Sequence, residues 1–184
     1  MHIAYISSEV VPFSKTGGLA DVAGALPEAL AEIGHQVSVF TPYYRVTKKI
    51  DSQATKVCEG TVPVGTEKVP YVVYKASIAK GGATYYLIDN AEYFDRDGLY
   101  GDHHGDYPDA CSRFIFFSRV SMAAAQQLGK PVDVYHSNDW SSALVAIYLK
   151  LSYNNHPFHG DAASLSRSTI FRIRACSGIG TGRC

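Results

Sequence analysis

The stretch SSEVVPFSKTGGLADVAGA (residues 7–25) decides the fold, because it joins a short apolar run to a segment with helical spacing. The run before it, HIAYI (residues 2–6), is typical of a buried strand. After it, Ala20, Ala23 and Leu26 recur at the spacing of one helix face. The order strand, loop, helix is that of the first βα connection of a parallel sheet, and such loops open onto ligand.

The loop between these two segments contains Lys15, Gly17 and Gly18. Two glycines would allow backbone conformations that are closed to other residues. N–H groups at the start of the following helix favour anions, and Lys15 adds a positive charge. These features favour a phosphate site, but a solvated lysine beside a Gly-Gly turn fits equally well. The glycine spacing matches neither G-x-x-x-x-G-K-[ST] nor G-x-G-x-x-G, so the residues alone leave both interpretations open.

Length and composition limit the possible classes of protein. A chain of 184 residues with 46% hydrophobic content fits one domain with one substantial core. Seventeen basic and seventeen acidic residues cancel, which favours neither nucleic acid nor a membrane surface as partner. The four cysteines form no C-x-x-C pair, and no apolar run has the length of a signal peptide or membrane span. We therefore expect reduced thiols and a cytoplasmic location.

The pattern of apolar residues predicts an α/β fold. Residues 37–40 form the second strand, parallel to the first, and Pro27 should break the helical segment between them into two short helices. Short β-rich runs at residues 57–64, 69–78 and 84–88 predict hairpins that flank this parallel core. We expect a Rossmann-like parallel sheet with flanking helices and a β-hairpin insertion.

Residues 89–109 are dense in Asp, Gly, Tyr and His. A metal site could recruit His103 and His104 together with nearby aspartates. However, adjacent histidines should point apart, and the glycines give no fixed ligand geometry. We therefore expect a solvated loop without a metal, of a length that often carries binding function.

A second junction between strand and helix follows this loop. A helix should begin at Asp109 as its N-cap and end before Gly129, and residues 132–137 should form a buried strand. Residues 141–151 predict another apolar helix. Asp139 lies between the last two elements. An aspartate there is a natural N-cap, and at the carboxyl end of a strand it can also reach a ligand.

Two of these stretches resemble bacterial glycogen synthases and plastid starch synthases. SSEVVPFSKTGGLADVAGALP (residues 7–27) resembles the N-terminal signature of that family. H-x-N-D-W at residues 136–140 resembles its H-x-H-D-W motif, with Asn138 in place of the second histidine. The resemblance implies the N-terminal half of a retaining GT-B glycosyltransferase. Such enzymes transfer glucose from ADP-glucose to the non-reducing end of an α-1,4-glucan, glycogen or starch, without a metal or other cofactor.

The resemblance also implies roles for single residues. In the family the lysine of K-T-G-G-L contacts the donor, which assigns donor binding to Lys15. N–H groups at Gly17 and Gly18 would stabilise the charge of the departing phosphate. Asp139 would be the catalytic residue that holds the sugar or acceptor. Further candidates from the same motifs and the loop are Asp21, His136, Phe94 and Arg96.

The last residues depart from the family pattern, which continues to about Leu165. Residues 166–184, SRSTIFRIRACSGIGTGRC, show no apolar periodicity. With codons chosen freely at degenerate positions, one added base converts their back-translation into FTIHNLSYQGMFGHWDRQM, which resembles the family. We therefore expect residues 1–165 to form the acceptor-side domain and residues 166–184 to be a frameshifted tail that supplies no strand after Leu165. The family's nucleotide-binding second domain would be absent from this chain.

Two classes of function remain open from the sequence. A glycogen or starch synthase would need the missing second domain, so these residues alone would be inactive. A nucleotide- or glucan-binding fragment without turnover is the alternative. An oxidoreductase or epimerase with a similar core would need the dinucleotide fingerprint that this chain lacks.

Overall fold

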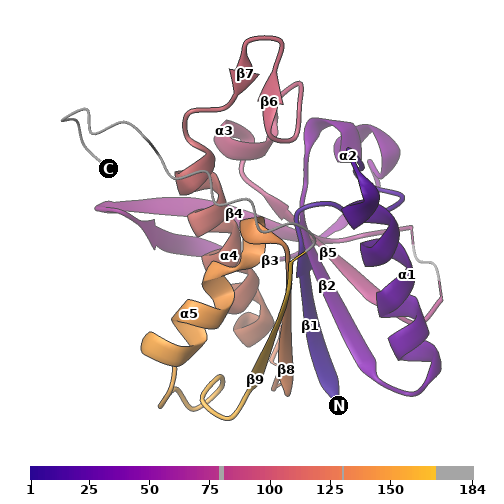
Figure 1. The fold of residues 1–184 in the computed structure, drawn as a ribbon, viewed down its shortest axis with the longest axis vertical. Coiled ribbons are helices and arrows are strands. Elements are labelled where there is room, and N and C mark those ends of the chain that lie inside the picture. The colour runs from indigo at the N-terminus through magenta and orange to yellow at the C-terminus, as the bar shows by residue number, and fades with distance from the viewer. Residues whose placement is uncertain (79–80, 130, 169–184) are drawn as a thin grey trace.

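The computed structural model describes residues 1–78, 81–129 and 131–168, and Figure 1 shows how they fold. In chain order the elements are β1 (His2–Ser7), α1 (Gly18–Glu32), β2 (Gln36–Pro42), α2 (Arg45–Ile50), β3 (Thr55–Val64), β4 (Glu67–Lys75), β5 (Thr84–Asp89), α3 (Ala91–Phe94), β6 (Gly101–Asp102), β7 (Gly105–Asp106), α4 (Ala110–Gln127), β8 (Val134–Asn138), the 3₁₀ turn η1 (Trp140–Ser142), α5 (Leu144–Leu151) and β9 (Ala163–Arg167). Within these ranges, no helix is both long and apolar enough to cross a lipid bilayer.

One seven-stranded sheet organises these elements in the order β3-β4-β5-β2-β1-β8-β9. Strands β5, β2, β1, β8 and β9 pair in parallel, whereas β3, β4 and β5 pair antiparallel. Helix α1 covers one face of the sheet, and α4 and α5 cover the other (Figure 1). The predicted parallel core with a β-hairpin insertion is confirmed, and the hairpin β3–β4 extends the same sheet.

The central strands are buried on both faces because helices cover both faces. Along β1, Ala4 and Ile6 belong to the larger core, together with residues of α4 and α5. Tyr5 points to the other side and joins the core under α1 with Val37 and Val39 of β2. The resulting apolar runs at the start of the chain are what made β1 and β2 predictable.

The continuous helix α1 shows that the predicted break at Pro27 is wrong. Pro27 lies inside the helix, although it has no N–H group to donate to the carbonyl four residues earlier. It is buried with Ala20 and Ala23 on the face that packs on the sheet. Because apolar contacts hold the helix on both sides of Pro27, tertiary packing offsets the lost hydrogen bond.

Residues 89–109 are more ordered than the solvated loop that we expected. They contain the short helix α3, capped by Asn90, and the hairpin β6–β7, which projects beyond the carboxyl end of the sheet (Figure 1). The rings of His103 and His104 lie 3.8 Å apart, so these neighbours do not point apart as predicted. Among the described residues, no three His, Cys, Asp or Glu side chains gather where a metal could bind.

Strand β9 extends two residues beyond Leu165, where we expected the tail to supply no strand. Residues Ala163–Arg167 pair in parallel with β8, and Leu165 lies opposite His136. All five residues are exposed, so β9 is an edge strand of the described sheet with little burial on either face. Ser166 and Arg167 of the predicted tail are therefore part of the sheet, whereas residues 169–184 lie outside the described residues.

Candidate functional site

A cleft of about 360 Å³ lies at the carboxyl ends of the parallel strands β1 and β8. We call it the cleft throughout, and its lining residues are Glu9, Gly17, Gly18, Leu19, Tyr100, Asp139 and Trp140. The structure thus brings together three of the predicted site residues, Gly17, Gly18 and Asp139. They lie at the sheet edge where α/β folds bind ligands.

The two glycines of the loop leave open space beside the cleft. Gly17 is the N-cap of α1, with an extended backbone (φ −149°), and Gly18 is the first residue of the helix. Both conformations are open to any residue, so the loop does not use the conformational freedom that its two glycines allow. A Cβ atom at either position would meet no atom within 4 Å. Glycine here keeps volume free at a helix N-terminus that favours anions.

The Glu9 carboxylate fixes this loop by accepting hydrogen bonds from it. No sequence pattern had singled out Glu9. Its side chain is only 3% exposed. One carboxylate oxygen accepts from the N–H groups of Thr16 and Gly17, the latter at 3.2 Å. The other accepts from the Thr16 hydroxyl at 2.6 Å and the Tyr100 hydroxyl at 2.8 Å. The N–H group of Gly17 is therefore engaged within the protein.

A row of hydroxyl groups continues from Tyr100 to the second strand–helix junction. The Tyr100 oxygen lies 2.8 Å from that of Ser8, and Ser141 donates to Ser8 at 2.7 Å. Burial raises the pKa of the Tyr100 phenol far above its usual range, and the charge of Glu9 adds to this. Tyr100 therefore stays protonated and remains a hydrogen-bond donor.

Lys15 forms an exposed ion pair with Asp21 on the first turn of α1. Its Nζ atom lies 2.6 Å and 2.8 Å from the two carboxylate oxygens, and both side chains are more than half exposed. Lys15 does not line the cleft in this conformation. Because exposed pairs contribute only about 0–1 kcal/mol, Asp21 can hold Lys15 near the cleft without preventing it from contacting a ligand.

Asp139 adopts a backbone conformation that is rare for a residue with a side chain. Its φ of 64° and ψ of 178° lie in a region used almost only by glycine, at a typical cost of about 1–3 kcal/mol. Its carboxylate accepts from the N–H of Trp140 at 2.8 Å, which confirms the predicted N-cap. Its own N–H donates to the carbonyl of Arg167 at 2.7 Å. Backbone strain beside a cleft is a frequent property of functional residues.

Trp140 presents an exposed aromatic surface at the edge of the cleft. Its side chain is 56% exposed, and its ring stands edge-on to Phe114 at 4.9 Å. The ring of Tyr100 lies 5.9 Å away. An exposed indole fixed by two neighbouring rings offers a rigid apolar face to a ligand.

His136 and Phe94 lie away from the cleft. His136 is 6% exposed and packs edge-on against Tyr5 at 4.8 Å. Burial, and the charge of Arg167, lower its pKa. Phe94 is fully buried in the larger core, edge-on to Tyr44 and beside Phe116. The structure gives both side chains packing roles, and neither reaches a ligand without rearrangement.

Arg96 fastens the 95–109 segment to the start of α4. Its guanidinium donates to both carboxylate oxygens of Asp109, at 2.8 Å and 2.5 Å, and to the carbonyl of Glu92. The group also stacks over the ring of Tyr107 at 4.9 Å. Asp109 makes no side-chain capping bond, so its predicted capping role is wrong because the carboxylate pairs with Arg96 instead.

Sequence reasoning missed four cleft residues, Glu9, Leu19, Tyr100 and Trp140. Glu9 and Trp140 lie inside the two quoted motifs, so position within a motif could have identified them. Nothing local distinguishes Tyr100 among thirteen tyrosines, because its partner Glu9 is 91 residues away in the chain.

Comparison with known proteins gives a consistent family. A family model described as the starch synthase catalytic domain matches residues 2–171. The glycogen synthase of Koribacter versatilis is 48% identical over 162 residues, which cover 85% of this chain and 32% of that protein. The glycogen synthase of Bacillus subtilis is 42% identical over 160 residues, which cover 86% of this chain and 32% of that protein.

A solved structure has the same fold. The catalytic domain of starch synthase IV from Arabidopsis thaliana, bound to ADP and acarbose, superposes with a TM-score of 0.73 at 23% identity. The match covers 90% of this chain and 32% of that one. This chain thus spans about a third of the length of the relatives that it matches. Because the family model covers most of its residues, this chain belongs to the glycogen and starch synthase family and corresponds to the N-terminal part of its GT-B catalytic domain.

Proposed function

We propose that this chain is the acceptor-side part of a retaining glycosyltransferase that transfers glucose from ADP-glucose to the non-reducing end of an α-1,4-glucan. The observation that carries the proposal is the cleft, which places the N-terminus of α1 beside Asp139. The starch synthase IV structure with the same fold was solved with ADP and acarbose. A helix N-terminus suits a nucleotide phosphate, and a carboxylate with an aromatic face suits sugar hydroxyls and rings.

The residues of the cleft suggest how the donor would be held. Departure of ADP builds negative charge on its β-phosphate, and positive dipoles at that point lower the barrier. Because the N–H of Gly17 donates to Glu9, we assign the phosphate contacts to Lys15 and Gly18, while Gly17 supplies space. Asp139 and Trp140 would hold the sugar or the acceptor on the opposite wall.

We further propose that residues 1–184 by themselves do not catalyse transfer. Holding nucleotide, sugar and acceptor together in a closed site contributes about 7–11 kcal/mol to catalysis. This chain matches only about a third of the length of its relatives, so we propose that these residues supply one side of such a closed site. The free thiols of Cys58 and Cys111 suit the cytoplasm, where we propose that the enzyme acts.

A titration followed by NMR tests ligand binding directly. ADP at millimolar concentration should shift the amide signals of Gly18, Leu19 and Trp140, whereas signals from the β3–β4 hairpin should stay unchanged. Adenosine without phosphates serves as the matched ligand control and should shift them much less. If ADP moves no signal of the cleft, the proposed donor site is wrong.

A transfer assay tests whether residues 1–184 catalyse transfer by themselves. Labelled ADP-glucose and glycogen are incubated with the 184-residue chain and with Lys15→Ala. We expect ADP binding without incorporation of glucose. Sustained incorporation above the Lys15→Ala control would show that residues 1–184 are sufficient for transfer.

A further inference from the structure

Glu9 is a buried carboxylate whose neighbours are donors rather than cations. It accepts four hydrogen bonds, two from backbone N–H groups and two from hydroxyl groups. None of the ion pairs within the described residues includes it. A charge taken out of water without a counter-ion is costly, and four well-placed donors offset that cost only while all are present. The position of every donor around Glu9 is thereby constrained.

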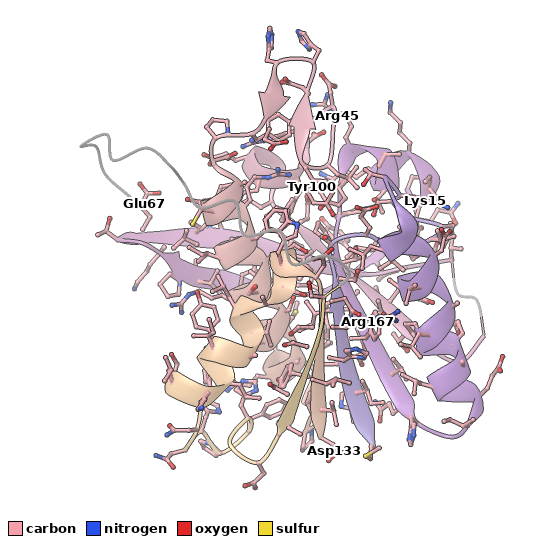
Figure 2. The ribbon with its side chains drawn as sticks, in the orientation of Figure 1. Lys15, Arg45, Glu67, Tyr100, Asp133 and Arg167 are labelled. Atoms are coloured by element: carbon pink, nitrogen blue, oxygen red, sulfur yellow. The ribbon has the colours of Figure 1, made fainter. Side chains whose placement is uncertain are left out.

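The four donors come from the two walls of the cleft. Thr16 and Gly17 belong to the loop before α1, which we call the glycine loop (residues 15–17). Tyr100 belongs to the segment 95–109, which we call the hairpin segment because it carries β6 and β7. Figure 2 shows Tyr100 below this hairpin and Lys15 beside α1 on the other side. Glu9 therefore touches both walls at once.

The direction of the hydrogen bonds can be assigned. A tyrosine hydroxyl has one hydrogen, and Tyr100 uses it toward Glu9, so Ser8 must donate to Tyr100. Ser141 in turn donates to Ser8. The hydrogen-bond chain thus runs from Ser141 through Ser8 and Tyr100 to the carboxylate of Glu9. Each hydrogen bond strengthens the next because the hydroxyl groups polarise one another.

We propose that Glu9 is a positioning residue that couples the hairpin segment to the glycine loop, so that the two walls of the cleft open and close together. A change that releases Tyr100 leaves the carboxylate with one unfilled acceptor position. The carboxylate is then less firmly placed, which weakens its hydrogen bonds with Thr16 and Gly17. The reverse also holds, because coupling between two sites is reciprocal. The coupling deepens the proposed function by linking donor and acceptor sides, but it does not itself require a ligand.

Hydrogen exchange of single amides in the 184-residue chain tests the coupling. Tyr100→Phe removes the hydroxyl and keeps the ring that packs on Phe114 and Trp140. The substitution lies outside the glycine loop. We nevertheless expect the amides of Thr16 and Gly17 to exchange about tenfold faster than in the wild type, the scale of one lost hydrogen bond to a charge. The unfolding midpoint in urea should also fall, because a hydrogen bond to a buried charge is lost.

Tyr107→Phe is the matched control. It also removes a hydroxyl from the hairpin segment, one that accepts from the N–H of Gly98 at 3.2 Å and does not touch Glu9. Exchange near Gly98 should become faster, while Thr16 and Gly17 should stay at the wild-type rate. A general loosening of the segment would move the two loop amides in both variants and would contradict specific coupling through Glu9.

The reverse direction uses Thr16→Val, which removes the hydroxyl bond from the loop side. Its reporter is the amide of Tyr107, which donates to the carbonyl of Tyr100 at 2.9 Å. We expect this amide to exchange faster in Thr16→Val and to recover the wild-type rate in Thr16→Ser, which restores the hydroxyl. A purely local role for Glu9 would leave Tyr107 unchanged.

These experiments distinguish failure of the coupling from failure of the proposed function. If Tyr100→Phe and Thr16→Val each leave the opposite wall at the wild-type exchange rate, the coupling is wrong even if ADP binds. If both walls respond but ADP shifts no cleft signal, the coupling stands and the proposed donor site fails. If one variant does not fold, the other still decides the question, because each probes the coupling from a different wall.

Discussion

The two ends of the parallel strands are packed in opposite ways. At the carboxyl end the loops leave a cleft with unfilled space at Gly17 and Gly18 and a strained residue, Asp139. At the amino ends of β1 and β8 the chain segments are tied together by short hydrogen bonds, such as the one from the N–H of His2 to Asp133 at 2.6 Å. Figure 2 shows Asp133 at this lower end of the sheet, opposite Lys15 and Tyr100.

We expect this difference to separate residues that serve stability from residues that serve binding. Open volume and backbone strain lower stability, so a fold retains them only where they serve something else. In an open α/β sheet the carboxyl end is the place where ligands bind. Substitutions at the amino end should therefore alter unfolding, and substitutions at the carboxyl end should alter binding.

The largest expected effect lies at the amino end, at His159. This side chain is 1% exposed, and its Nδ1 atom lies 2.7 Å from the Tyr135 hydroxyl. Burial, and then the charge of His156, lower its pKa from 6.5 to about 4. As pH falls below 6.5 the unfolded chain takes up this proton first. The free energy of unfolding should therefore drop by about 1.4 kcal/mol per pH unit toward pH 4, by about 3 kcal/mol in total, and level off below that.

Urea unfolding at several pH values checks this contribution. His159→Gln cannot be protonated, so its stability should fall less steeply between pH 6.5 and pH 4 than that of the wild type. His103→Gln removes an exposed histidine and should keep the wild-type slope. Equal slopes for wild type and His159→Gln would show that His159 does not control stability at this end.

At the carboxyl end, Lys15→Ala should weaken ADP binding by about 1.5–3 kcal/mol, the range for a charge-assisted hydrogen bond. Its stability should change by less than about 1 kcal/mol, because the pair with Asp21 is exposed. Titration calorimetry and urea unfolding measure the two effects on the same variant. Lys68→Ala removes an equal charge from the distant hairpin and should alter neither. An ADP affinity unchanged by Lys15→Ala would remove the phosphate role.

The sequence predicted the parts of the fold that depend on neighbouring residues. Strands β1 and β2 and the hairpin β3–β4 carry their own apolar or β-branched pattern, so local reasoning located them. The break at Pro27 was wrong because burial against the sheet outweighs one lost hydrogen bond. That balance depends on tertiary contacts, which no local pattern contains.

The candidate site was predictable to the same extent. Motifs located Gly17, Gly18 and Asp139, which the structure brings to one cleft. Tyr100 was not predictable, because its contact with Glu9 spans 91 residues of chain. Motifs therefore mark the parts of the cleft that are local in the sequence, whereas a contact between distant segments is found only in the folded protein.

Gly24 and Gly18 give a further test of this comparison, with an expected effect on stability of intermediate size. Gly24 lies inside α1, and a Cβ atom there would come within 2.9 Å of the carbonyl oxygen of Val11. At Gly18 the same atom would meet open space. We expect Gly24→Ala to be about 1–2 kcal/mol less stable than Gly18→Ala in urea unfolding, since overpacking against backbone forces a shift.

The two glycine variants should rank in the opposite order for ADP affinity. A methyl group at Gly18 fills cleft volume beside the helix N-terminus, so Gly18→Ala should weaken ADP binding while the fold is unaffected. Gly24→Ala, measured where it is fully folded, should bind ADP as the wild type does. If Gly18→Ala bound ADP normally, the free space at this position would not belong to the donor site.

The smallest expected effect is a gain in stability at Asp139. Glycine tolerates a φ of 64° and a ψ of 178°, so Asp139→Gly should release backbone strain of about 1–3 kcal/mol. Part of this gain is cancelled, because glycine adds freedom to the unfolded chain and removes the bond to the N–H of Trp140. We expect a net gain of about 1 kcal/mol in the free energy of unfolding.

Asp139→Ala is the decisive companion, because it removes the same carboxylate but keeps a Cβ atom in the strained conformation. It should be less stable than the wild type by about 1 kcal/mol, the usual cost of a lost N-cap. Stability in the order Gly, Asp, Ala would show that the aspartate is retained at this point against the preference of the backbone. If Asp139→Gly were the least stable of the three, Asp139 would serve the fold, and the contrast between the two ends of the sheet would fail at its central residue.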